Sequence, residues 1–120
     1  MSLDVYLRRK KWVSYDKGEN WEEELEEVFW SNITHNLNEM AAEAGIYQAC
    51  WRPEEIGATT AKDIIPLLEI GLADLKERPK YFKKFDSTNG WGRYEDFVPW
   101  VEEYLNACKE YQDAEIYVSI

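Results

Sequence analysis

Alternating apolar and polar residues mark a strand near each end of the chain. Leu3, Val5 and Leu7 alternate with polar and aromatic neighbours, and residues 114–120 repeat the alternation from Ala114 onward. A period of two residues is typical of a strand with one buried face. We therefore predict a strand in each of these two segments.

The first strand is predicted to continue into a hairpin. Gly18 lies in a polar segment at 14–20, after which the chain becomes β-prone up to Trp30. Opposite charges across a strand pair favour one register. Counting outward from a turn at Lys17 and Gly18 gives the pairs Lys11 with Glu24, Arg9 with Glu26 and Arg8 with Glu27. The glutamate-rich composition also permits a helix over residues 20–28.

Helical spacing predicts a first short helix within residues 34–45, with His35 in its first turn. Its apolar residues recur at the spacing of one helix face, and Gly45 provides a stop. These apolar residues are Leu37, Met40, Ala41 and Ala44. Residues 46–57 then look irregular, apart from a single turn that Pro53 can begin and Gly57 can end.

A second helix is predicted to open at Thr59 or Thr60, where Thr60 and Asp63 form a variant of the capping box. Pro66 removes one backbone donor within this segment, so we expect a kink or a later start. Residues 79–85 form one further short turn or helix. The apolar stripe of the second helix consists of Ile64, Leu67, Leu68, Leu72 and Leu75.

A third helix is predicted to begin near Tyr94. Its core stripe consists of Phe97, Val101, Leu105 and Cys108, while Trp100, Tyr104 and Tyr111 lie beside or behind that stripe. Together the elements predict a single α+β domain over residues 1–120. Its small antiparallel or mixed sheet, made of the N-terminal hairpin and the C-terminal strand, is covered on one face by three main helices.

Composition narrows the class of protein. The formal net charge of -10 repels phosphates and disfavours nucleic acid as a partner. Apolar residues make up 45% of the chain, which excludes a disordered protein, and no apolar run approaches the roughly 20 residues of a membrane span. Cys50 and Cys108 match no metal-ligand spacing, so we interpret them as reduced, buried thiols of a cytoplasmic protein.

No catalytic or metal motif is recognisable. His35 is the only histidine, and nothing in the sequence identifies a carboxylate that would orient it. Walker, dinucleotide and nucleophile-elbow motifs are missing, so we predict no catalytic residue, no cofactor and no transition-metal site. The many carboxylates leave a magnesium site open. An enzyme with an unfamiliar site stays as an alternative, with His35, Arg52, Glu54 and Glu55 as its candidates.

Two segments combine aromatic rings with positive charge. Arg52 lies between Trp51 and Pro53, and a cluster of lysines surrounds Tyr81 just before a glycine-rich loop. Such combinations can bind an anionic ligand through stacking and charge. The candidate ligand-binding residues are Trp51, Arg52, Lys80, Tyr81, Lys84, Trp91 and Arg93. The alternatives are an internal salt bridge of Arg52 and lysines that simply complement a helix end.

The loop "NGWG" raises a question of its own. Asn89 and Gly90 form turns readily, and Gly92 frees the chain to enter the third helix, so geometry explains the glycines. It does not explain Trp91. We favour Trp91 as a lid packed onto the helices over the alternative of a binding surface beside Arg52 and the lysines.

Four stretches, "NITHNL", "WRPEE", "NGWG" followed by an aromatic residue, and the closing "DAEIYVSI", resemble a family of small uncharacterised proteins of phages, prophages and bacterial genomes. The resemblance covers about residues 30–120. It implies a phage setting and carries no activity or catalytic residue with it. Small acidic phage proteins often block a host protein or sequester a host signalling molecule.

We therefore predict a non-catalytic binding protein that acts on a host protein or on a small anionic, nucleotide-like ligand. A nucleic-acid mimic is one variant of this hypothesis, and it would use Glu22, Glu23, Glu24, Glu26 and Glu27. A structural or assembly protein is a further alternative, because a surplus of half-buried aromatic side chains favours a homo-oligomer.

Overall fold

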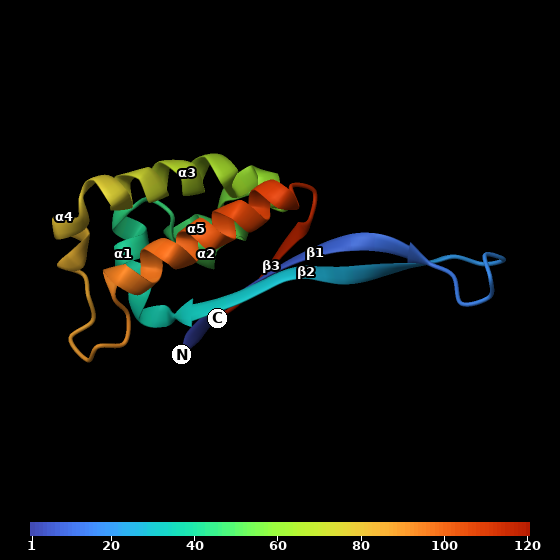
Figure 1. Cartoon of the computed structure of the whole chain (residues 1–120), viewed down its shortest axis with the longest axis horizontal. Helices are drawn as coiled ribbons and strands as arrows, with labels where there is room; N and C mark the ends of the chain where they lie inside the picture. The colour runs from blue at the N-terminus through green and yellow to red at the C-terminus, as the bar shows by residue number, and fades with distance from the viewer.

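The computed structural model describes residues 1–120 and consists of a three-stranded sheet with helices on one side (Figure 1). Strands β1 (Ser2–Val13) and β2 (Glu22–Thr34) form a hairpin, and β3 (Glu115–Ser119) pairs with the other edge of β1. Both pairings are antiparallel. The predicted α+β class is confirmed, and the sheet is the antiparallel one of the two alternatives.

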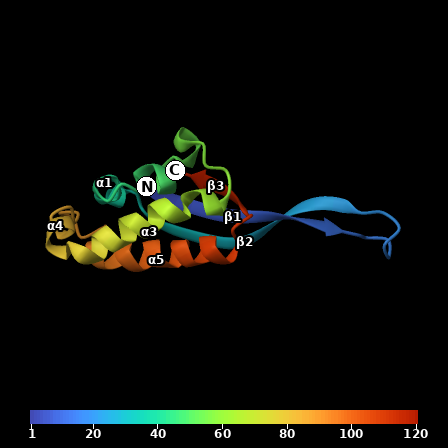
Figure 2. The same ribbon diagram turned by 90° about the horizontal axis from the view of Figure 1, so that it is seen from above.

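The helices cover one face of this sheet. The two long helices, α3 (Ala61–Glu77) and α5 (Tyr94–Glu110), pack against each other along the sheet (Figure 2). Of the short elements, α2 (Tyr47–Trp51) occupies part of the segment that the sequence pattern left irregular. The short elements are η1 (His35–Leu37), α1 (Asn38–Glu43), α2 (Tyr47–Trp51), η2 (Pro53–Ile56) and α4 (Pro79–Lys83).

The hairpin has the register that the charges predict. Its turn includes Lys17 and Gly18, both with positive φ, and residues 20–28 are strand rather than the alternative helix. Lys11 lies opposite Glu24, Arg9 opposite Glu26 and Arg8 opposite Glu27. The register shifts after Leu7, so Val28 is the extra residue of a β-bulge.

The start of α3 follows the predicted capping box. The backbone N–H groups of Thr59 and Thr60 each donate to Asp63 Oδ2, both at 3.0 Å. These bonds hold the pKa of the Asp63 carboxyl below its ordinary value. Of the two outcomes expected from Pro66, a kink or a later start, the later start is wrong, because α3 begins at Ala61 and runs on through Pro66.

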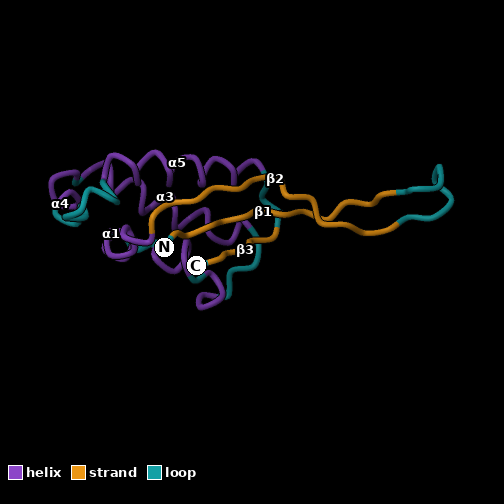
Figure 3. Tube along the Cα trace, turned by 90° about the horizontal axis from the view of Figure 1, so that it is seen from below, coloured by secondary structure: helices purple, strands orange, loops and turns teal.

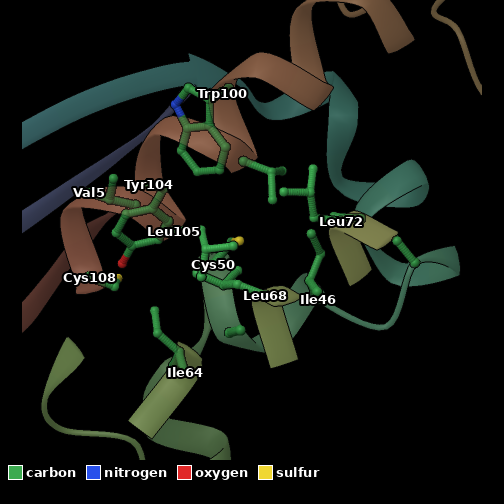
Figure 4. Close-up of a cluster of buried hydrophobic side chains, with 14 of the residues drawn as sticks. Val5, Ile46, Cys50, Ile64, Leu68, Leu72, Trp100, Tyr104, Leu105 and Cys108 are labelled. Atoms are coloured by element: carbon green, nitrogen blue, oxygen red, sulfur yellow. The ribbon is translucent and has the colours of Figure 1, made fainter. Parts of the chain in front are cut away.

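A core of 26 buried residues lies between the sheet and the helices (Figure 4). Leu3, Val5 and Leu7 face it from β1, as their alternation predicts. The buried face of α5 is wider than the predicted stripe, since Trp100 and Tyr104 are also buried. On α3, four of the five residues of the predicted apolar stripe are buried, and the fifth, Leu67, is exposed.

Several polar groups are buried within this core. Cys50 and Cys108 are both free and buried, and burial raises the pKa of the Cys108 thiol to about 12. The Trp100 indole N–H and the Tyr104 hydroxyl are buried without a hydrogen-bond partner. Burial also raises the pKa of Tyr104 well above its ordinary value.

The far half of the hairpin leaves the body of the protein. The pairing of β1 with β3 ends at Arg8, and beyond this residue β1 pairs with β2 alone. We call residues 9–26 the arm, which projects away from the helices (Figures 1 and 3). No residue of the arm is buried, and the molecule measures 59 × 27 × 23 Å.

No helix of the structure has the length and apolar character needed to cross a lipid bilayer.

Candidate functional site

Three stretches that are distant in the sequence meet at the turn after β2. Trp51 Nε1 donates to His35 Nδ1 at 3.1 Å, and Asn36 Nδ2 donates to the Trp91 carbonyl oxygen at 2.8 Å. Gly92 packs so closely here that a Cβ atom on it would lie 3.2 Å from Thr34 Cγ2. "NITHNL", "WRPEE" and "NGWG" therefore form one structural unit, which we call the motif junction.

Both ring nitrogens of His35 are occupied in the motif junction. An indole N–H can only donate, so His35 Nδ1 accepts and the proton of the neutral ring lies on Nε2. His35 Nε2 lies 3.1 Å from the side-chain amide of Asn38, which must therefore present its oxygen to this N–H. The geometry gives His35 a structural role and leaves no free nitrogen for proton transfer.

The first two candidate ligand residues serve different purposes in the structure. Trp51 is only 1% exposed and stacks on Tyr47, with ring centroids 5.6 Å apart. Its ring therefore belongs to the core. Arg52 is exposed, and its Nη1 lies 3.9 Å from Glu54 Oε1, which is the internal salt bridge that the sequence left as an alternative.

The aromatic ring of the basic segment has an internal partner. The Tyr81 hydroxyl donates to Glu43 Oε2 at 2.6 Å, and this bond raises the pKa of Tyr81. The Arg78 guanidinium lies 4.5 Å from the centroid of the same ring while it forms a two-pronged ion pair with Asp74. Lys84 lies 5.6 Å from the Tyr81 centroid. Lys80 and Lys84 have no carboxylate within ion-pair distance.

Trp91 is not the lid that we favoured from the sequence. Its side chain is 72% exposed, while the neighbouring Gly92 is buried against the turn. The Arg93 guanidinium lies beside Gly90 in the same loop. Of the five main surface cavities, one is lined by Trp91 and another by Lys84, and none is lined by two of the seven candidate residues.

Large exposed apolar side chains concentrate on the arm. Trp12, Tyr15, Trp21 and Leu25 are between 47% and 72% exposed. The Tyr15 hydroxyl donates to Glu24, and this bond holds the tyrosine against β2 without burying its ring. No element of the body packs over these four side chains, so they are free to contact another molecule.

A row of aromatic rings continues this surface onto the sheet. Tyr6 lies directly opposite Trp30 on one side and Tyr117 on the other. The Arg8 guanidinium lies 4.8 Å from the Tyr6 centroid and 4.7 Å from the Tyr117 centroid. By strand alternation Trp12 points to the same side as Tyr6. We call this side, which faces away from the helices, the open sheet face.

Two ion pairs join the strands of the arm. Lys10 Nζ lies 3.4 Å from Glu23 Oε1, and Arg9 Nε lies 3.2 Å from Glu26 Oε2. Arg8 and Glu27 form a longer pair of 3.8 Å at the base of the arm. Three of the five glutamates named for a nucleic-acid mimic, Glu23, Glu26 and Glu27, therefore have an internal cationic partner, which reduces the negative potential of this strand.

The aromatic residues of the arm were missed as functional candidates, although the sequence contains a signal for them. Positions on the buried side of β1 change from Leu7 to Arg9 and Lys11, and this change marks where the core ends. Trp12 comes after that point and, by alternation, lies on the same side as Tyr6, so no core is available to bury its ring.

No group of three or more His, Cys, Asp or Glu side chains is arranged to hold a metal ion. The chain matches no protein-family model, no curated protein and no solved structure.

Proposed function

We propose that this chain is a non-catalytic binding protein whose arm and open sheet face dock onto a partner protein. The observation that supports this most strongly is the exposure of Trp12, Tyr15, Trp21 and Leu25 on the arm. Exposed apolar side chains that gather on one projecting element are typical of an interaction surface.

The chemistry of the arm suits a protein partner. Tryptophan and tyrosine are enriched among the residues that contribute most to protein–protein binding. The Lys10–Glu23 ion pair lies among these side chains, because Lys10 is opposite Leu25 and Glu23 is opposite Trp12. Apolar side chains flanked by paired charges resemble the centre and rim of an interface. A partner that packs over this face would therefore bury aromatic area while Lys10 and Glu23 keep each other as partners.

The family resemblance supports a setting for this function. In a phage setting, the partner is a host protein and the site of action is the host cytoplasm. A small anionic ligand has less support, because Arg78, Lys83 and Arg52 each contact a carboxylate of their own chain. Lys80 on α4 and Lys84 just after it are exposed and have no ion-pair partner, but neither lines a cavity with Trp91.

Site-specific photo-cross-linking followed by binding measurements tests this proposal. A photoreactive residue replaces Trp21 on the arm or, as a control, Ile70 on α3, which is similarly exposed at 69%. We expect the Trp21 position alone to cross-link to a defined host protein. The cross-linked protein is then purified and titrated with the wild-type chain.

The double substitution of Trp12→Ala and Trp21→Ala is expected to weaken that binding by about a hundredfold or more, as loss of two central aromatic contacts does. Ile70→Ala should leave it unchanged. Equal binding by the arm variant would contradict the proposal. Sedimentation of the chain alone separates a further outcome, since self-association that the same double variant abolishes would identify an assembly protein instead.

A further inference from the structure

Trp91 has an exposed ring on a firmly held backbone. The Trp91 N–H donates to Asn89 Oδ1 at 2.9 Å, and its carbonyl accepts from Asn36 Nδ2 at 2.8 Å. The Ser87 N–H closes the loop by donating to the Gly92 carbonyl at 2.8 Å. The loop is thus fixed at both sides of Trp91, yet the indole ring gains no burial from this arrangement.

The exposed ring borders a surface hollow of about 600 Å³. This hollow lies between the loop and the base of the hairpin, where β1 begins and β2 ends. We call it the Trp91 hollow. Its polar lining consists of Ser2, Asn32, Thr34, Asn36 and Asn89. Charged residues make up 32% of the chain, but no charged side chain lines this hollow.

Hydrogen-bonding capacity remains free on these side chains. Asn32 makes no side-chain hydrogen bond, Asn36 uses only its amide nitrogen, and Asn89 uses only its oxygen. Each free amide group therefore offers donors or acceptors to a ligand. No lysine or arginine lines the hollow, so it lacks the side chains that usually clamp an anion. The α-amino group of Met1 is its one charged donor, and it can donate to a hydroxyl oxygen as well.

We propose that the Trp91 hollow binds a neutral saccharide. A sugar ring has an apolar C–H face that can lie on the indole, and hydroxyl groups at its edge that both donate and accept hydrogen bonds. Side-chain amides match such hydroxyls because an amide also donates and accepts. The site is independent of the arm, and it adds a small-molecule ligand to a protein that we propose to bind another protein.

Indole N–H resonances in heteronuclear NMR spectra can test this site directly. The Trp91 resonance is identified by its loss in Trp91→Phe. The chain is titrated with the neutral trisaccharides maltotriose, cellotriose and triacetylchitotriose, and separately with adenosine, AMP and glucose 6-phosphate. We expect at least one trisaccharide to shift the Trp91 resonance at millimolar concentration, and the three other compounds to leave it in place.

Three variants then locate the binding. Trp91→Ala should weaken saccharide binding by about tenfold or more, and Asn32→Ala by roughly two- to tenfold. Trp12→Ala removes a similarly exposed indole from the arm and should leave saccharide binding unchanged. The proposal is overturned if no trisaccharide binds, if adenosine or an anion binds instead, or if Trp91→Ala binds saccharide as the wild type does.

Discussion

The body and the arm share the same two strands but differ in what holds them together. Within the body, β1 directs Leu3, Val5 and Leu7 into a core and has a strand on each side. Within the arm, the same strand has one partner and no buried residue, and its support comes from backbone pairing and exposed ion pairs. The body can therefore be stable while the arm is free to serve binding, and substitutions should separate the two.

The largest expected effect is the truncation of a buried ring in the body. Trp51→Ala should lower the free energy of unfolding by about 3–5 kcal/mol, because it opens a cavity and leaves His35 Nδ1 without its donor. The matched change on the arm, Trp12→Ala, should cost less than about 0.5 kcal/mol. Urea denaturation of both variants measures the difference in the free energy of unfolding. A similar loss for the two variants would contradict the claim that the body is stable independently of the arm.

A gain of stability is expected from a second change in the core. Tyr104→Phe removes a buried hydroxyl that has no hydrogen-bond partner, and it keeps the ring that stacks on Phe29. An unsatisfied buried polar group costs about 1–3 kcal/mol, so the variant should be more stable by about 1 kcal/mol. Tyr15→Phe on the arm serves as the control and should not raise the denaturation midpoint. A destabilised Tyr104→Phe would mean that the hydroxyl has a partner.

The cap of α3 gives the body a pH dependence of similar size. Because the folded-state pKa of Asp63 is lowered, its ionised form stabilises the fold above the unfolded-state pKa. That contribution is lost as the pH falls through the folded-state value. Asp63→Asn should cost about 1 kcal/mol at neutral pH, and this cost should shrink below about pH 4. A constant difference at all pH values would contradict the assignment.

The smallest effect is expected within the arm. A double-mutant cycle on Arg9 and Glu26 should give a coupling free energy below about 1 kcal/mol, since both side chains contact water. High salt should remove most of this coupling. A coupling as large as the effect of Trp51→Ala would show that the arm depends on its charges for folding.

Local chemistry explains which parts of the fold could be predicted. The hairpin register follows from Gly18 and from opposite charges such as Arg9 and Glu26, all of which act between near neighbours. The capping box of Thr60 and Asp63 is equally local. The burial of Trp51 depends on contacts with Tyr47 and His35 in the folded chain, and its residue type alone could not distinguish a ligand contact from a core ring.

The outward direction of Trp91 was missed for a related reason. The glycines at 90 and 92 predict a turn, but the hydrogen bond from Asn36 that fixes this turn spans 55 residues. The long reach of the arm was missed as well, because alternation predicts a strand without saying whether a helix covers it. The change from Leu7 to Arg9 on one side of β1 was the available signal.

The pairing of β1 with β3 also has a consequence for how the chain folds during synthesis. These strands are separated by about 100 residues, and contacts of such long sequence separation slow folding. While the ribosome makes the intervening helices, one edge of β1 stays without its partner. An unpaired edge can capture other strands, so the nascent chain is vulnerable to misassembly until residues 115–119 emerge.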